Sequence, residues 1–111
     1  MSLENWSEDI VIAHLSDEPS LSEDLVQLVS RFDAEDERDV VLDLGDVHYL
    51  NSTNISQLLK LRKRCGTSGR RMKLCKVNDS VWGVILVTGL DKHFDFAEDV
   101  SLALASLQMG I

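Results

Sequence analysis

Four consecutive small polar residues, Asn51-Ser52-Thr53-Asn54, are the part of the sequence whose types and spacing are best suited to chemistry. They follow a short apolar segment and directly precede a helical pattern, so they lie where extended chain gives way to a helix. The first N–H groups of a helix have no partner within it, and a side-chain oxygen or an anion can accept from them. Two roles stay open: these residues cap the helix, with Asn54-x-x-Gln57 resembling a capping box, or they meet a ligand or partner.

The other residues that could do chemistry are scattered. His14, His48 and His93 fall on three different elements, with no cluster at the spacing of metal ligands. Asp43 and Asp46 flank the end of a strand, which is weak evidence for acid–base chemistry. The sequence holds no phosphate-binding loop, dinucleotide fingerprint or nucleophile elbow. We therefore expect a protein that is not an enzyme, with no catalytic residue, no metal site and no cofactor.

The elements that must position the polar run alternate along the chain. Period-two apolar patterns predict strands, and apolar residues at three- and four-residue steps predict helices. Strands are expected at Asp9–Leu15, Asp39–Leu44 and Arg71–Val77, with a short one at Phe94–Phe96. Helices are expected over Leu21–Phe32, Ile55–Cys65, Asn78–Thr88 and Glu98–Leu107. This order predicts a single α/β domain with a mostly parallel sheet of four to five strands and about four helices.

Several residues are expected to begin or end these helices. Ser20 or Ser22 can cap the first helix, with Ser20-x-x-Glu23 in the form of a capping box, and Asn78 is a cap for the third. Gly69 and Gly89 are expected to end the second and third helices in the left-handed conformation.

The length of 111 residues and the apolar share of 44% suit one domain with a real core. Residues 1–8 are expected to form an N-terminal extension, and 9–111 the domain. Cys65 and Cys75 are too few for a disulfide framework, which predicts two reduced, partly buried thiols. No N-terminal run resembles a signal peptide, since Met1–Trp6 is short and polar, and the longest apolar run, Val81–Val87, is too short to span a bilayer. We therefore expect a cytoplasmic protein.

Charge is unevenly distributed. The net charge is −8, yet eight of the eleven Lys and Arg residues lie between Lys60 and Lys76. An acidic total argues against nucleic acid as a partner, since phosphates repel it. The basic segment is either a solvated helix face whose cations favour the helix C-terminus, or a docking patch for an acidic partner.

Two short motifs resemble those of the STAS family, which includes bacterial anti-sigma factor antagonists. The runs Val40–Leu44 and Val47–Ile55 are similar to the family's strand followed by Asp-Ser-Ser/Thr-Gly-Leu, and Leu86–Leu90 is similar to its Thr-Gly-Leu marker. The resemblance covers roughly residues 9–108 and implies the SpoIIAA-like STAS fold. The chain departs from the Asp-Ser-Ser/Thr-Gly-Leu motif in two places: Asn51 stands where the family has Asp, and Asn54 where it has Gly. It also has Ser16-Asp17-Glu18-Pro19 where the family often has Gly-x-Leu/Ile-Asp.

The resemblance also implies a function. In the family's anti-sigma factor antagonists, the serine after the Asp is phosphorylated by a kinase that is itself the anti-sigma factor, which makes Ser52 the phosphorylation candidate here. Asn51, Thr53 and Asn54 then flank the contact edge with the partner. The expected role is therefore to bind an anti-sigma factor or serine-kinase-like regulator in transcription regulation.

A second candidate contact surface comes from the residues of the third helix. Val81, Val84, Ile85 and Thr88 are expected to face the core, which leaves Trp82 and Leu86, four residues apart, on a flanking or outward face. These two either cover further core or form an apolar contact for a partner or for a second copy in a homodimer.

Two alternatives to the phosphorylation switch stay open. One is a phosphorylation-independent STAS interaction module, as in a stressosome-like complex or an accessory subunit of a lipid transporter. The other is a STAS domain that binds a small ligand or nucleotide through the amides at the start of the Ser52 helix.

Overall fold

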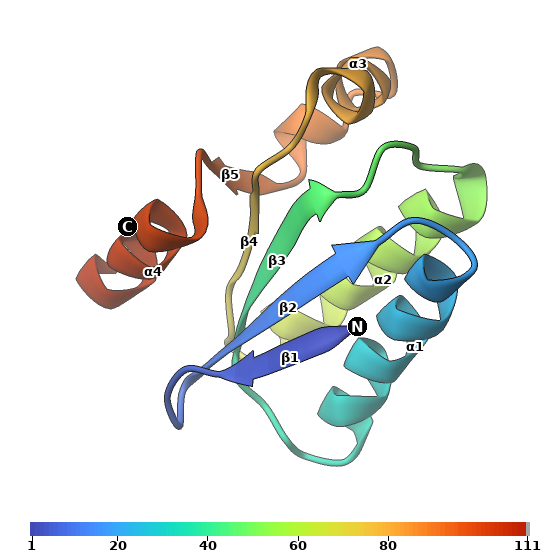
Figure 1. Ribbon diagram of the computed structural model, residues 1–111. Coiled ribbons are helices and arrows are strands. Elements are labelled where there is room, and N and C mark those ends of the chain that lie inside the picture. The colour runs from blue at the N-terminus through green and yellow to red at the C-terminus, as the bar shows by residue number, and fades with distance from the viewer. Residues whose placement is uncertain (111) are drawn as a thin grey trace.

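A five-stranded sheet with helices on both faces forms the molecule (Figure 1), and the computed structural model describes residues 1–110. The strands are β1 (Ser2–Asn5), β2 (Ile10–Ser16), β3 (Asp39–Asp46), β4 (Met72–Cys75) and β5 (Asp95–Ala97). The helices are α1 (Ser20–Asp33), α2 (Ser52–Thr67), α3 (Asp79–Val87) and α4 (Val100–Met109), with a 3₁₀ turn at Leu90–Lys92. The predicted α/β class, strand number and helix number are all confirmed.

The strands lie side by side in chain order, β1-β2-β3-β4-β5. The pairs from β2 to β5 are parallel, and β1 alone is antiparallel to its neighbour. A crossover helix joins each parallel pair, as the alternating pattern predicts. The carboxyl ends of β2, β3 and β4 therefore meet at one edge of the sheet.

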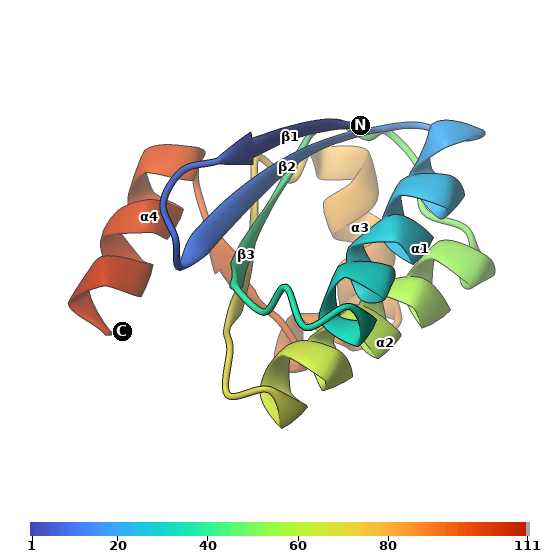
Figure 2. The same ribbon diagram turned by 90° about the horizontal axis from the view of Figure 1, so that it is seen from below.

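The two faces of the sheet are covered unequally (Figure 2). Helices α1, α2 and α3 lie on one face, and α4 alone lies on the other. Alternate residues of β4 divide between these faces: Met72 and Leu74 belong to the larger core, while Cys75 packs with Ala103 and Leu107 of α4. This is the division that the period-two pattern of the strand predicts.

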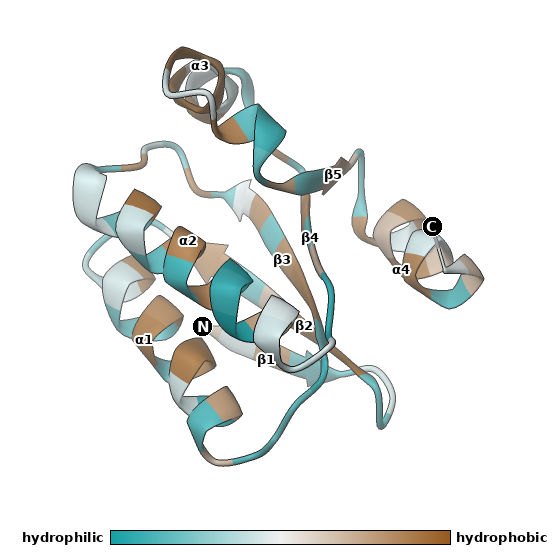
Figure 3. Ribbon diagram, turned by 180° about the vertical axis from the view of Figure 1, so that it is seen from behind, coloured by the Kyte–Doolittle hydropathy of each residue, from teal (hydrophilic) through white to brown (hydrophobic). Residues whose placement is uncertain are grey.

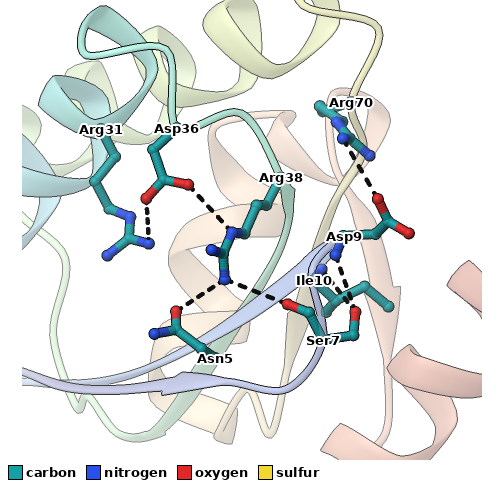
Figure 4. A network of polar contacts seen from close by, with 8 residues as sticks. All are labelled: Asn5, Ser7, Asp9, Ile10, Arg31, Asp36, Arg38 and Arg70. Atoms are coloured by element: carbon teal, nitrogen blue, oxygen red, sulfur yellow. Dashed lines mark hydrogen bonds and ion pairs between the residues drawn. The ribbon is translucent and has the colours of Figure 1, made fainter.

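The extension expected at residues 1–8 contributes an edge strand. Strand β1 pairs with β2 in the register Ser2 to His14 and Asn5 to Val11. Arg38 fastens the β1–β2 turn to the chain that precedes β3 (Figure 4), because its guanidinium donates to Asn5 Oδ1 at 3.1 Å and to the carbonyl of Ser7 at 3.2 Å.

The helix ends follow the sequence expectations in part. Asn78 accepts from the N–H of Val81 at 3.1 Å, and Gly69 and Gly89 have φ near +70°, so these three are confirmed. The capping box expected at Ser20 is wrong, because Pro19 occupies the N-cap position of α1 without a side-chain hydrogen bond.

Candidate functional site

The loop between β3 and α2 holds the start of α2 against the sheet edge. Val47 and Leu50 are buried in the core, at 0% and 3% exposure, and the two residues between them point outward. One of these is Tyr49, which is 65% exposed. It adds an aromatic ring beside the predicted contact edge, and sequence reasoning missed it. The available signal in the sequence was the pair His48 and Tyr49 between two aliphatic residues, Val47 and Leu50, that fit a core.

Helix α2 begins with a reciprocal capping box made by two asparagines. Asn51 Oδ1 accepts from the N–H of Asn54 at 2.8 Å, and Asn54 Oδ1 accepts from the N–H of Asn51 at 3.0 Å. The box expected between Asn54 and Gln57 is therefore wrong by three residues. Both residues that depart from the Asp-Ser-Ser/Thr-Gly-Leu motif belong to this box, and each needs the other to complete it.

Asn54 is also the residue that joins α2 to α1. Its Nδ2 donates to Ser22 Oγ at 3.2 Å, and the residue is 0% exposed. Asn54 therefore has no surface to offer a partner, and its expected place at the contact edge is corrected: it supports that edge from inside. The amide side chain is long enough to reach α1, which a glycine at this position could not do.

A carboxylate completes this polar cluster on its solvent side. Glu18 accepts from the N–H of Ser22 at 2.6 Å and from its hydroxyl at 2.5 Å. These two bonds from Ser22, the hydroxyl first, lower the pKa of Glu18, with smaller contributions from Asn51 and Asn54. Glu18 thus takes the capping role expected of Ser20 and places a negative charge close to the start of α2.

Ser52 and Thr53 are the first two residues of α2, and both are exposed. Within residues 1–110, neither hydroxyl has a hydrogen-bond partner. Asn51 performs the capping that these hydroxyls were alternatively expected to perform, so their side chains are left to solvent. The sequence predicted an uncovered Ser52 hydroxyl at the point where extended chain gives way to a helix, and the structure has an exposed Ser52 at the start of α2.

A second acidic residue borders the same edge. Asp17 accepts from the backbone N–H of His48 at 2.7 Å and contacts its Nδ1 at 2.9 Å. These contacts, the backbone bond first, lower the pKa of Asp17. From the α3 side, the Ser80 hydroxyl donates to the carbonyl of His48 at 2.9 Å. The loop ahead of Ser52 is therefore held from both neighbouring helix starts.

Helix α3 places the two residues of the second candidate surface differently. Trp82 is half-buried and packs edge-on against Phe96 of β5, with ring centroids 4.9 Å apart. Leu86 is 50% exposed and Val87, beside it, is 89% exposed. Thr88 was expected in the core but is exposed, with its hydroxyl bonded to the carbonyl of Val84 at 2.7 Å. The outward apolar surface of α3 thus lies at Leu86 and Val87 rather than at Trp82.

The structure also pairs two residues that the sequence left apart. His14 Nδ1 lies 2.6 Å from Asp43 Oδ2, on the face of the sheet that carries α4, and its Nε2 lies 3.2 Å from Glu4 Oε1. The bonds to Asp43 and Glu4 raise the pKa of His14. Burial alone would raise the pKa of Asp43, but the N–H of Gly45 and the ring of His14 outweigh it and lower that pKa. The pair connects residues 29 positions apart, so no local spacing could have found it.

Residues 1–110 contain no group of three or more His, Cys, Asp or Glu side chains arranged to hold a metal ion. In the same part of the chain, no helix combines the length and the apolar character needed to cross a membrane.

Comparison with known proteins places this geometry in context. The family model described as STAS domain matches residues 9–103. No curated protein matches the chain.

Among solved structures, an anti-sigma-factor antagonist (STAS) domain protein from Planctomyces limnophilus is 18% identical, with a TM-score of 0.81 and coverage of 96% of this chain and 97% of that one. The phosphorylated form of the Bacillus cell fate determinant SpoIIAA is 13% identical, with a TM-score of 0.74 and coverage of 96% and 97%. A chain of the stressosome is 16% identical, with a TM-score of 0.68 and coverage of 96% of both chains. At these low sequence identities, the similarity shows a shared fold and nothing further.

Proposed function

The chain belongs to the STAS domain family, and from that membership we propose that it is a regulatory module that binds partner proteins through the edge around Ser52. The observation that carries the proposal is the free, exposed hydroxyl of Ser52 at the first position of a 16-residue helix. Thr53 lies beside it on the exposed first turn, and Asn51 caps the helix behind both. The partner is an anti-sigma factor or a related serine-kinase-like regulator.

We propose further that Ser52 is the phosphorylated residue. Its hydroxyl oxygen attacks the γ-phosphorus of ATP held by the kinase, the bond to the β–γ bridging oxygen breaks, and ADP leaves. The hydroxyl proton passes to a base of the kinase. In this step no residue of this chain needs to act as a catalyst.

The start of α2 can accommodate the added phosphate without unfolding. A phosphate carries about −1.5 to −2 charges at neutral pH, and the positive end of the helix dipole favours an anion there. The first N–H groups of α2, those of Ser52 and Thr53, have no acceptor within the helix. The side chain of Asn51 is already engaged with Asn54, so the phosphate displaces no cap.

The same charge changes what a partner meets. Asp17 and Glu18 already make the region beside Ser52 acidic, since their carboxylates are ionised at neutral pH, and their lowered pKa values keep them ionised in more acidic solution as well. Phosphorylation adds to this negative field on the exposed edge. A partner that closes over the unmodified serine is therefore released.

The test is the intact mass of the protein after incubation with a candidate kinase and ATP. We expect an increase of about 80 Da, one phosphoryl group, on the wild type and on Thr53→Ala, and none on Ser52→Ala. Thr53 is the matched control, because it is exposed on the same helical turn. An increase that persists in Ser52→Ala would reject Ser52 as the acceptor.

A second candidate function is a phosphorylation-independent interaction module, and the surface of α3 favours it. Leu86 and Val87 form an exposed apolar pair of the kind that marks protein contacts. In this alternative, partner binding or self-association uses α3, and Trp82 supports that surface from behind by packing on Phe96. No mass increase with any candidate kinase, together with partner binding lost in Leu86→Ser, would favour this second function.

A further inference from the structure

A basic hollow lies at the opposite end of α2 from Ser52. It has a volume of about 540 Å³ and opens between the last turns of α2, the α2–β4 loop and the 3₁₀ turn after α3. Five of the chain's eleven Lys and Arg residues line it, and Asp95 is the one acidic residue in its lining. The lining cations are Arg62, Lys63, Arg70, Arg71 and Lys92. Figure 3 shows the hydrophilic colouring of the C-terminal part of α2 and of the turn that precedes β5.

The helix dipole accounts for only part of this cluster. Cations near the end of α2 are favoured by its carbonyls whatever their function. Lys92, however, reaches the same hollow from a different element, 20 or more residues further along the chain. The convergence of distant cations on one hollow, in a protein of net charge −8, is not required by the stability of α2.

Most of these charges are available to a ligand. Within residues 1–110, Arg62, Lys63 and Lys92 are exposed and form no ion pair. Arg70 has only a long contact, 3.7 Å, with Asp9, whose side chain is 75% exposed (Figure 4). Arg71 is held in place by donating to the carbonyls of Ser106 and Leu107 at the end of α4.

The lining also indicates the kind of anion that fits. The apolar residues at the bottom, Cys65, Met72 and Phe94, are 1%, 6% and 8% exposed, so they offer little surface to a planar ring. The exposed cations are carried on long, flexible side chains, so each can pair with a separate carboxylate.

We propose that this basic hollow binds an acidic segment of a partner protein, a run of Asp and Glu residues in extended chain. The partner's carboxylates pair with Arg62, Lys63 and Lys92, and the fixed Arg71 sets the inner end of the contact. Such pairing raises the rate of encounter and weakens steeply with salt.

The test uses a fluorescently labelled peptide of alternating Asp and Glu and follows its anisotropy at low ionic strength. We expect Lys63→Glu and Lys92→Glu each to weaken binding at least about fivefold, because each reverses one cation of the hollow. Lys60→Glu is the matched control: it makes the same change in net charge on the exposed side of α2 but does not line the hollow. We expect it to change binding less than about twofold.

Three results would overturn the proposal. Equal weakening by Lys60→Glu and Lys92→Glu would mean attraction by net charge alone. If Lys63→Glu weakens binding and Lys92→Glu does not, the peptide binds the face of α2 instead of the hollow. Tighter binding of tripolyphosphate than of the peptide would assign the hollow to small anions. The peptide assay does not depend on Ser52, and the mass assay of phosphorylation does not depend on the basic hollow, so this proposal can fail without the proposed function failing, and the reverse.

Discussion

Asn51 and Asn54 each hold the backbone N–H of the other with a side-chain oxygen, at 2.8 and 3.0 Å. The two positions at which the chain departs from the family's motif are thus one structural unit. The unit fixes the first turn of α2 and leaves Ser52 and Thr53 exposed between its members.

Replacing Asn54 by Ala should destabilise the protein. The substitution removes the acceptor of the Asn51 N–H and the donor to Ser22 at a site with 0% exposure. Buried polar groups that lose their partners cost about 1–3 kcal/mol each, so we expect the free energy of unfolding to fall by about 2 kcal/mol. Urea denaturation measures this change. Thr53→Ala, on the exposed side of the same turn, should stay within about 0.5 kcal/mol. Equal effects would mean that the box does not stabilise α2.

Replacing Trp82 should lower the free energy of unfolding more than replacing Leu86 does. Trp82→Ala removes the edge-on contact with Phe96 and part of the core cover, so we expect a loss of about 2 kcal/mol. Leu86→Ala removes a side chain that is 50% exposed and should cost about 0.5 kcal/mol or less. Chemical denaturation of both variants checks this. If both lose the same stability, Leu86 belongs to the core, and Leu86→Ser is no longer a clean probe of partner binding.

The pair of His14 and Asp43 should make stability depend on pH. The folded-state pKa of His14 is raised above 6.5 by Asp43 first and Glu4 second, so its contribution is fully present below about pH 6.5 and is lost as pH rises through the folded value. The gain is well under about 1 kcal/mol, because solvent screens a side chain that is 35% exposed.

The measurement is the difference in unfolding free energy between wild type and His14→Gln across this range. It should be larger below about pH 6.5 than at alkaline pH, above the folded pKa of His14. Asp43→Asn provides the control, since the NMR titration midpoint of His14 should fall when its main partner loses its charge. A midpoint that Asp43→Asn leaves unchanged would show that the contact does not perturb His14.

Both cysteines should resist alkylation in the folded protein. Cys65 and Cys75 are unpaired and buried, and burial raises the pKa of each thiol to about 12. The reactive thiolate is therefore almost absent at pH 8. We expect no mass increase with iodoacetamide under native conditions and two additions in denaturant. Rapid labelling of the native protein at either residue would contradict the burial of that thiol.

The main elements of the fold were predictable because they carry a local signal. The apolar runs of β2 and β3 and the periodic pattern of α1 each identify an element within its own segment. Strand β1 gave no such signal, because all four of its residues are exposed and nothing in it alternates between core and solvent. Its place in the sheet comes from pairing with β2, a contact between segments.

The candidate site divides in the same way. The exposure of Ser52 follows from its place at the junction of an extended segment and a helix, and the local sequence pattern predicts that junction. The burial of Asn54 does not, because it depends on Ser22, 32 residues earlier in the chain. The approach of Lys92 to the end of α2 likewise depends on the path of the chain through α3 and could not be predicted from spacing.

Helix α2 is a spacer as well as a support. Its 16 residues make it about 24 Å long, and Arg62, the first cation of the basic hollow along the chain, follows Ser52 by ten residues, or about 15 Å along the axis. That is nearly twice the distance over which physiological salt damps exposed charges. A charge added at one end is therefore hardly felt at the other. A partner protein long enough to span the helix could bind its two ends independently. Modification of Ser52 would then leave the contact with the basic hollow intact.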